Sequence, residues 1–334
     1  MRKAHALMSD DSANSLLQIA SAFQQSRCLL SACELDIFTI IGNDQKTAKE
    51  IAISAGTHEK STEKLLNALC AIHLLNKTEN KYSNTKGTRR YLVKTRPEYI
   101  GNMMFLTHQW EKWDHLTEAI RTGKAVSYQD ISDKPREWVA TYVESSYWRA
   151  LQKAPDVVKA INLQDINSIL DLGCGSGVYS IEFKKAKPSM SVTAYDLPTI
   201  LYETLKVVTR AGMERDIEIV SGDFTRDEIP GKYDAIFISK VLLYYSFWEN
   251  VALLNKLFNL LNHKGTLIIH DTVINDNKTA PESATIDALH LLVNTESGDV
   301  FTESDLWMML KESWFTHQKT IATPFDTSII IAQK

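Results

Sequence analysis

A glycine-rich run flanked by two carboxylates contains the residues of this sequence that are best suited to chemistry. Asp171 precedes Gly173, Gly175 and Gly177, and missing side chains in such a tight turn let a ligand approach the backbone. Asp196 lies 23 residues after Gly173, where doubly wound folds place the carboxylate that binds ribose hydroxyls. The spacing predicts a nucleoside-binding site, with a purely structural glycine turn as the alternative.

Two later segments extend this predicted site. Asp223 and Phe224 follow a third apolar run, and there a carboxylate can bond the edge of adenine while an aromatic ring stacks on its face. Lys240 follows a fourth apolar run, at the edge where such sheets bind ligands. The glycine turn alone suits both hydride-transfer and sulfonium cofactors, and these additional residues favour the sulfonium class.

Alternating strands and helices must position these residues. The apolar pattern predicts strands at 168–172, 191–195, 217–220, 234–239, 265–270 and 327–332, with helices between them that include 198–211, 249–261 and 303–312. This alternation predicts an α/β fold, a Rossmann-like, doubly wound and mostly parallel sheet with helices on both faces.

Residues 1–105 are predicted to form a separate, mostly helical domain. Short helices at 47–52 and 61–69, the first capped by Thr47, precede two short strands around 74–82, which is a winged-helix pattern. The second helix mixes acidic and basic residues, whereas a helix that binds phosphates should be basic. We therefore expect a packing or dimerisation domain, with DNA binding as the weaker alternative. Leu16, Leu17, Phe23 and Leu29 make an apolar surface that suggests a partner chain.

Residues 106–334 form the predicted catalytic domain, which opens with a helical connector rich in aromatic residues up to about 160. Most of these side chains are expected to pack in a core. The functional interpretation is one wall of a ligand pocket, with His108 as a candidate contact.

Composition sets limits on the function. The 334 residues suffice for two domains, and a net charge of −4 gives no general reason to bind nucleic acid or an acidic membrane. No segment approaches the ~20 apolar residues of a membrane helix, and the cysteines and histidines show no metal-type spacing. The sequence predicts a cytoplasmic protein without a metal, a nucleic acid or a membrane as partner.

Taken together, these motifs resemble the class I S-adenosylmethionine-dependent methyltransferases, and specifically the small-molecule O-methyltransferases related to caffeate and acetylserotonin O-methyltransferases. Residues 47–82, the segment after the fourth strand and residues 289–296 carry this resemblance, which extends over nearly the whole chain. It implies a homodimer with a winged-helix dimerisation domain, and S-adenosyl-L-methionine as cofactor. The cofactor residues it implies are Asp171, Gly173, Gly175, Asp196, Leu197, Asp223, Phe224 and Lys240.

The chain departs from the family at the catalytic base. Aligned without gaps from Asp234 to Leu254, it has Leu243 where the family has the histidine that removes the acceptor's proton. A leucine cannot accept a proton. Of the two family glutamates beside that histidine, one corresponds to Asp271 and the other to Val300, or to Asp299 if the register slips by one. The loss favours acceptors that ionise easily, such as enols or acidic carbons, over ordinary alcohols.

Other residues are candidates for the lost role. His290, three residues after Asp287, is the preferred general base or substrate anchor, together with Asp271 as a catalytic residue. His108, Tyr244 and Asn294 are predicted to contact substrate. The predicted function is methylation of a small, aromatic or polyketide-like secondary metabolite at oxygen or carbon. The alternatives are an S-adenosylmethionine-binding enzyme that transfers no methyl group and a non-catalytic regulator.

Overall fold

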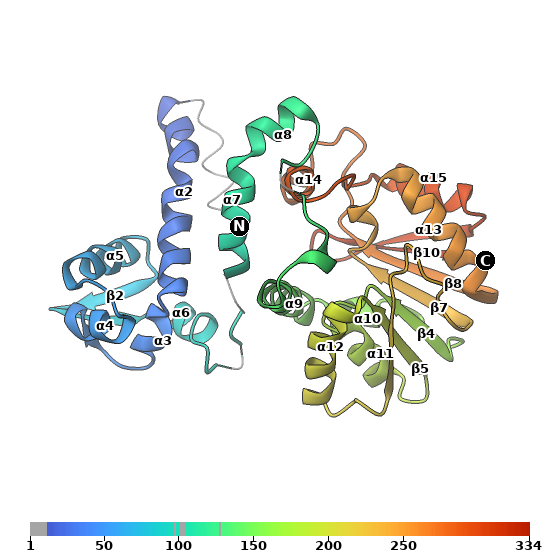
Figure 1. Cartoon of the computed structure of the whole chain (residues 1–334), viewed down its shortest axis with the longest axis horizontal. Helices are drawn as coiled ribbons and strands as arrows, with labels where there is room; N and C mark the ends of the chain where they lie inside the picture. The colour runs from blue at the N-terminus through green and yellow to red at the C-terminus, as the bar shows by residue number, and fades with distance from the viewer. Residues whose placement is uncertain (1–11, 97, 101–103, 127) are drawn as a thin grey trace. The chain divides into compact units, whose positions relative to one another are not determined.

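A computed structural model of the chain describes residues 12–96, 98–100, 104–126 and 128–334. The chain divides into two compact units, Met1–Thr107 and His108–Lys334. Figure 1 colours the first unit from blue to cyan and the second from green to red. No described helix is both long and apolar enough to span a lipid bilayer.

The first unit combines helices with a small antiparallel sheet. Its strands pair in the order β1-β3-β2. A capping box starts α4: the Thr47 hydroxyl accepts from the Glu50 amide at 3.3 Å, and the Glu50 carboxylate accepts from the Thr47 amide at 2.7 Å. The helices α4 and α5 and the hairpin β2–β3 follow one another as the winged-helix pattern requires. The elements of this unit are α2 (Ala13–Glu34), α3 (Ile37–Ile41), β1 (Lys46–Thr47), α4 (Ala48–Ala55), α5 (Glu59–Ala71), β2 (Leu75–Thr78), β3 (Lys81–Asn84) and α6 (Lys86–Tyr91).

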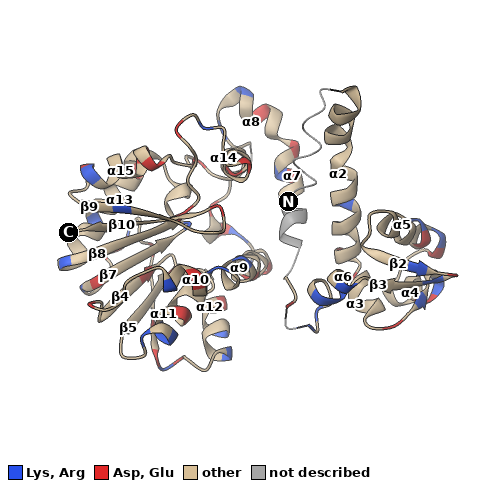
Figure 2. Ribbon diagram, turned by 180° about the vertical axis from the view of Figure 1, so that it is seen from behind, with Lys and Arg blue, Asp and Glu red and all other residues tan. Residues whose placement is uncertain are grey.

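The surface of the first unit is apolar along α2 and mixed in charge on α5. On α2, Leu16 is 69% exposed, Leu17 65% and Phe23 54%. Figure 2 shows acidic and basic residues next to one another on α5. The exposed apolar side chains of α2 therefore offer a surface that a second chain can cover.

The second unit is an α/β domain built around a seven-stranded sheet in the order β6-β5-β4-β7-β8-β10-β9. Strands β4 to β8 are parallel, while β10 is antiparallel to both of its neighbours. The strands are β4 (Ser168–Leu172), β5 (Ser191–Asp196), β6 (Ile217–Ser221), β7 (Tyr233–Ser239), β8 (Leu261–Asp271), β9 (Thr316–Ala322) and β10 (Ser328–Gln333). The predicted doubly wound, mostly parallel sheet is confirmed.

Helices cover both faces of this sheet because successive strand residues point to opposite sides. Leu170 and Ile236 pack with α13 and α15, whereas Ile169 and Phe237 pack with α10, α11 and α12, and Figure 1 shows these two helical layers. The helices are α7 (Met104–Asp114), α8 (Leu116–Thr122), α9 (Arg136–Leu151), α10 (Ala154–Lys159), α11 (Val178–Ala186), α12 (Pro198–Arg210), α13 (Phe247–Leu260), α14 (Glu282–Asn294) and α15 (Glu303–Glu312), with short 3-10 helices η2 (Ile131–Asp133) and η3 (Leu242–Tyr244).

Two strands differ from the sequence-based expectation. β8 begins at Leu261, directly after α13, so it is longer than the predicted 265–270. β9 is absent from the prediction because it is an edge strand with mostly exposed, polar side chains and therefore lacks an apolar alternation.

Candidate active site

The glycine turn follows β4. It has no room for a side chain at Gly173 but has open space beside Gly175. Gly173 and Gly175 have φ of +68° and +54°, values that favour glycine. A side-chain carbon at Gly173 would lie 2.7 Å from Val241 Cγ2, so packing excludes one there. At Gly175 the same carbon would meet nothing within 4 Å, so a ligand can reach this part of the backbone.

Asp196 ends β5 beside this turn. Its Oδ2 accepts from the Gly175 amide at 2.8 Å and its Oδ1 accepts from the Leu197 amide at 2.8 Å. Burial raises the pKa of Asp196 to about 6, although both amide donors favour the charged form. Each carboxylate oxygen can accept more than one hydrogen bond, so the ionised group can still bind hydroxyl donors.

Asp171 lies beneath the turn as a second buried carboxyl. It accepts from the Ser180 hydroxyl at 2.5 Å. Burial, with a further contribution from nearby Asp196, raises its pKa to about 7. This hydrogen bond ties the end of β4 to α11, and the cofactor role of Asp171 stays a prediction.

Asp223 and Phe224 follow β6 and reach the same edge. The Gly222 amide donates to the Asp196 carbonyl at 3.0 Å, which ties this loop to the end of β5. Phe224 Cε1 lies 4.0 Å from where a side-chain carbon of Gly173 would be. Asp223 Oδ1 accepts from the Thr225 amide at 2.9 Å and from its hydroxyl. The structure thus brings the glycine turn, Asp196, Asp223 and Phe224 together at three adjacent strand ends.

Lys240 and Asp271 occupy the ends of the next two strands, β7 and β8. Lys240 Nζ lies 3.7 Å from Asp271 Oδ1 and also contacts the Thr272 hydroxyl. Burial raises the pKa of Asp271 to about 6, and Lys240 limits the increase. Asp271 is therefore a buried carboxyl that titrates near neutral pH.

His290 and Asn294 lie one turn apart on α14. Asn294 Nδ2 donates to the His290 carbonyl at 2.9 Å, and the His290 ring lies 6.4 Å from that of Trp113. Burial and then Arg149 lower the pKa of His290, against the attraction of Asp287. His290 is therefore neutral at physiological pH. The remaining candidate, His108, is in α7, but its side chain lies outside the described residues.

Leu243 lies in an apolar environment. It packs with Ala288 against the buried side chains of Ile274, Ala284, Leu291 and Val300. Leu243 and Val300, the positions at which the resemblance predicts the loss of the family's histidine and of one glutamate, therefore belong to one cluster.

The next residue, Tyr244, is held in a different way. Its hydroxyl lies 3.0 Å from that of Tyr142. Although 40% of Tyr244 is exposed, desolvation by the groups packed around it, and then Tyr142, raise its pKa, so the phenol stays protonated. The buried Asn250 fixes this turn by donating to the carbonyls of Leu242 at 2.8 Å and Tyr245 at 3.2 Å.

The sequence-based list missed the contribution of α9. Tyr142 and Arg149 lie on α9, where Tyr142 contacts Tyr244 and Arg149 lies within electrostatic range of His290. Lys153, two residues after the end of α9, lies within electrostatic range of Lys240. The available signal was the spacing of 7 residues between Tyr142 and Arg149, which places both on one side of a helix. The neighbouring aromatic residues are typical of core packing, so the sequence pattern did not single out this polar helix face.

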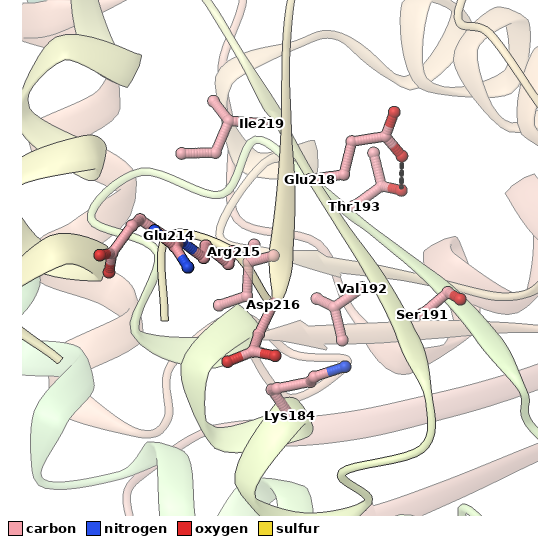
Figure 3. Close-up of a pocket in the computed structure, with 10 residues that line it drawn as sticks. Lys184, Ser191, Val192, Thr193, Glu214, Arg215, Asp216, Glu218 and Ile219 are labelled. Carbon is pink, nitrogen blue, oxygen red and sulfur yellow. Dashed lines mark hydrogen bonds between the residues drawn. The ribbon is translucent and has the colours of Figure 1, made fainter. Parts of the chain in front are cut away.

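A separate cavity of about 490 Å³ lies at the opposite ends of the strands (Figure 3). Ser191 and Thr193, near the start of β5, line it with Glu218 of β6, whereas Asp196 is at the other end of β5. Thr193 donates to Glu218 at 3.1 Å within this cavity. It is therefore distinct from the site around the glycine turn.

Comparison with known proteins gives consistent matches over nearly the whole chain. The O-methyltransferase domain family matches residues 113–316, and the O-methyltransferase dimerisation domain family matches residues 17–94. The tetracenomycin polyketide synthesis 8-O-methyl transferase of Streptomyces glaucescens is 27% identical over 335 residues and covers 96% of each chain. The L-tyrosine C(3)-methyltransferase of Streptomyces lavendulae is 26% identical and covers 88% of this chain and 82% of its own. Human N-acetylserotonin methyltransferase, solved with SAM, shares the fold with a TM-score of 0.86 at 21% identity, covering 98% of this chain and 99% of its own.

Proposed function

Because the chain belongs to the O-methyltransferase family and is an S-adenosyl-L-methionine-dependent methyltransferase, we propose that it methylates a small aromatic or polyketide-like acceptor at oxygen or carbon. The names of its relatives support this acceptor class. One of them acts in the synthesis of the polyketide tetracenomycin and another on L-tyrosine.

The residues at the three strand ends fit S-adenosyl-L-methionine. The open backbone at Gly175 can take the methionine part, and Asp196, flanked by Leu197, can accept bonds from ribose hydroxyls. Phe224 and Asp223 can stack on adenine and bond to its edge, and Lys240, directly after the neighbouring strand β7, is proposed to line the site. The cofactor supplies a methyl group on a positively charged sulfonium, which is already activated for transfer.

The observation that carries this assignment is the buried Asp196 beside a glycine backbone that a ligand can reach. We expect Asp196→Ala to weaken S-adenosyl-L-methionine binding by about 1.5–3 kcal/mol, the value of charge-assisted hydrogen bonds. Isothermal calorimetry measures this directly. Asp216→Ala, which changes a carboxylate of the remote cavity, is the matched control. Unchanged affinity in Asp196→Ala, or preferential binding of NAD, contradicts the assignment.

For the chemical step, we propose that no side chain at position 243 acts as the base. Leu243 packs against apolar side chains, and a leucine cannot itself accept a proton. Two other groups can accept a proton. One is the carboxylate of Asp271, whose pKa burial raises to about 6. The other is a ring nitrogen of the neutral His290. Tyr244 and Asn294 are the proposed substrate contacts.

His290→Ala tests the choice of base. If His290 is the base, turnover falls by roughly 10²–10⁴-fold while the cofactor Kd stays the same. Full activity from pH 6 to 9 would instead assign His290 to packing. Asp271→Asn, measured in parallel, shows whether the buried carboxyl has that role.

The atom that receives the methyl group, oxygen or carbon, distinguishes the two remaining possibilities. The two relatives with similar identity act at oxygen and at carbon, so family membership does not choose between them. Methylated products identified by mass spectrometry make that choice. A protein that binds the cofactor but forms no S-adenosylhomocysteine with any acceptor would instead be an enzyme with another reaction or a regulator.

A further inference from the structure

One side of α9 presents polar groups to the proposed acceptor site. Tyr142, Ser146 and Arg149 recur at positions i, i+4 and i+7, which places them on one helical face. One contact fixes the direction of this face, and a second joins two of its residues. The Tyr142 hydroxyl lies 3.0 Å from that of Tyr244, and Arg149 Nη2 lies 3.5 Å from Ser146 Oγ.

Positive charge collects where this face meets the ends of β7 and β8. Arg149 acts electrostatically on Tyr244, His290 and Lys153, which come from three different segments. Lys153, just after α9, lies 5.9 Å from the Phe325 ring and is repelled by Lys240. Arg149, Lys153 and Lys240 therefore lie within electrostatic range of the same part of the catalytic domain.

The acidic groups of this region have partners of their own. Asp271 is paired with Lys240 at 3.7 Å, and Asp326 accepts from Ser283 at 3.4 Å. Burial lowers the pKa of Lys153, and repulsion from Lys240 and Arg149 contributes more than the attraction of Asp326 and Asp287.

The apolar cluster behind Leu243 offers no base, whereas this region offers cations and phenol donors. We propose that the acceptor carries an oxygen anion, a carboxylate or an ionised phenol or enol, which Arg149 binds with Lys153 and the Tyr142–Tyr244 hydroxyl pair. This inference rests on the proposed methyltransferase function. Where the bound oxygen anion is itself the atom that is methylated, it has no proton to lose, so no base is needed at position 243.

The test compares two probes of the same shape, 1-naphthoate and the neutral 1-naphthamide. Their affinities for the protein saturated with S-adenosylhomocysteine are measured by calorimetry. We expect naphthoate to bind about tenfold or more tightly than naphthamide, because charge-assisted hydrogen bonds form only with the anion. In Arg149→Met this preference falls to near unity while naphthamide affinity is unchanged.

Arg136→Met is the matched control, since Arg136 lies on the first turn of the same helix with its guanidinium 3.7 Å from the Tyr202 ring. It should keep the naphthoate preference. Lys153→Met should reduce the preference, and Arg149→Lys should keep part of it. A third probe, 4-nitrophenol, shows through its absorbance whether the site also favours a phenolate.

Equal affinity of the two probes, no measurable naphthoate binding at millimolar concentration, or a preference that survives Arg149→Met would overturn the inference. Binding of S-adenosylhomocysteine is measured in the same samples and confirms that each variant is folded. Loss of that binding in the wild type would contradict the proposed function, whereas its presence without an anion preference contradicts only this inference.

Discussion

At the scale of single residues, two glycines of the same turn should respond differently to the same change. Gly173→Ala combines φ of +68° with a carbon 2.7 Å from Val241 Cγ2, so the free energy of unfolding should fall by about 1–3 kcal/mol or more. Gly175→Ala has φ of +54° but meets no atom within 4 Å, so the backbone cost of about 1–2 kcal/mol stands alone. Its added methyl group occupies space proposed for the cofactor.

Chemical denaturation and calorimetry separate these two effects. We expect Gly173→Ala to lose more stability and Gly175→Ala to lose cofactor affinity. The double variant Gly173→Ala/Val241→Ala should recover part of the lost stability because it removes the contacting methyl group. Equal losses of stability in both single variants would show that the close packing at Gly173 has no energetic effect.

The titration of Asp196 predicts how cofactor affinity depends on pH. Only the ionised carboxylate can accept two or more hydroxyl donors without giving up an acceptor site to a proton. Since burial raises its pKa to about 6, affinity should be constant above pH 7 and weaken as the pH falls below 6. Asp196→Asn removes this titration, so the difference between the two pH profiles isolates it from Asp171. Parallel profiles would contradict the proposed contact.

At the scale of elements, the sequence predicts the strands that carry the cofactor residues, because buried parallel strands are continuous apolar runs with glycine or acidic residues at their ends. It predicts substrate contacts at Tyr244, Asn294 and His108, but not the contribution of α9. Tyr142 and Arg149, both on α9, approach Tyr244 only through tertiary packing. Their local patterns are equally typical of a packed helix, so no single window of the sequence contains the signal.

The sheet itself contains a titrating group in His270, which joins three elements to β8. Its Nδ1 lies 2.8 Å from the Ser239 hydroxyl of β7 and 3.2 Å from that of Tyr179 in α11, and its Nε2 lies 2.9 Å from the Thr327 hydroxyl just before β10. Burial, with Lys240 and Lys153, lowers the pKa of His270 to about 3. The ring therefore stays neutral in the fold.

This neutral ring predicts acid sensitivity. The unfolded chain protonates a histidine below its ordinary pKa of 6.5, whereas the folded chain does so only near 3, so stability is lost as the pH falls through that window. The loss should approach 1.4 kcal/mol per pH unit. Urea unfolding at pH 6.5 and 4.5 measures this loss. In His270→Gln, unfolding should take up one proton fewer, so the free energy of unfolding should depend less steeply on pH. An identical slope in the variant would show that His270 does not titrate in this way.

At the scale of the whole molecule, the match of residues 17–94 to an O-methyltransferase dimerisation domain supports a homodimer. The exposed apolar residues of α2 provide a surface for it, with Leu17 65% and Phe23 54% exposed. Light scattering should give twice the chain mass of 37.8 kDa at micromolar concentration.

Leu17→Asp/Phe23→Asp should shift that mass toward the monomer, because a charged side chain is costly to bury in an apolar interface. Met308→Asp changes an equally exposed apolar residue of α15, 54% exposed, and should leave the mass unchanged. A wild-type protein that scatters as a monomer would contradict the dimer.

The shared apolar cluster of Leu243 and Val300 constrains substitutions at either position. If these residues occupy the places of the family's base and its glutamate partner, neither can return alone. A histidine at 243 would lie among Ile274 and Leu291 without a carboxylate from position 300, and a glutamate at 300 would bury an unpaired charge, so each single change costs stability. Introducing this pair of polar residues into the chain therefore passes through a destabilised single variant.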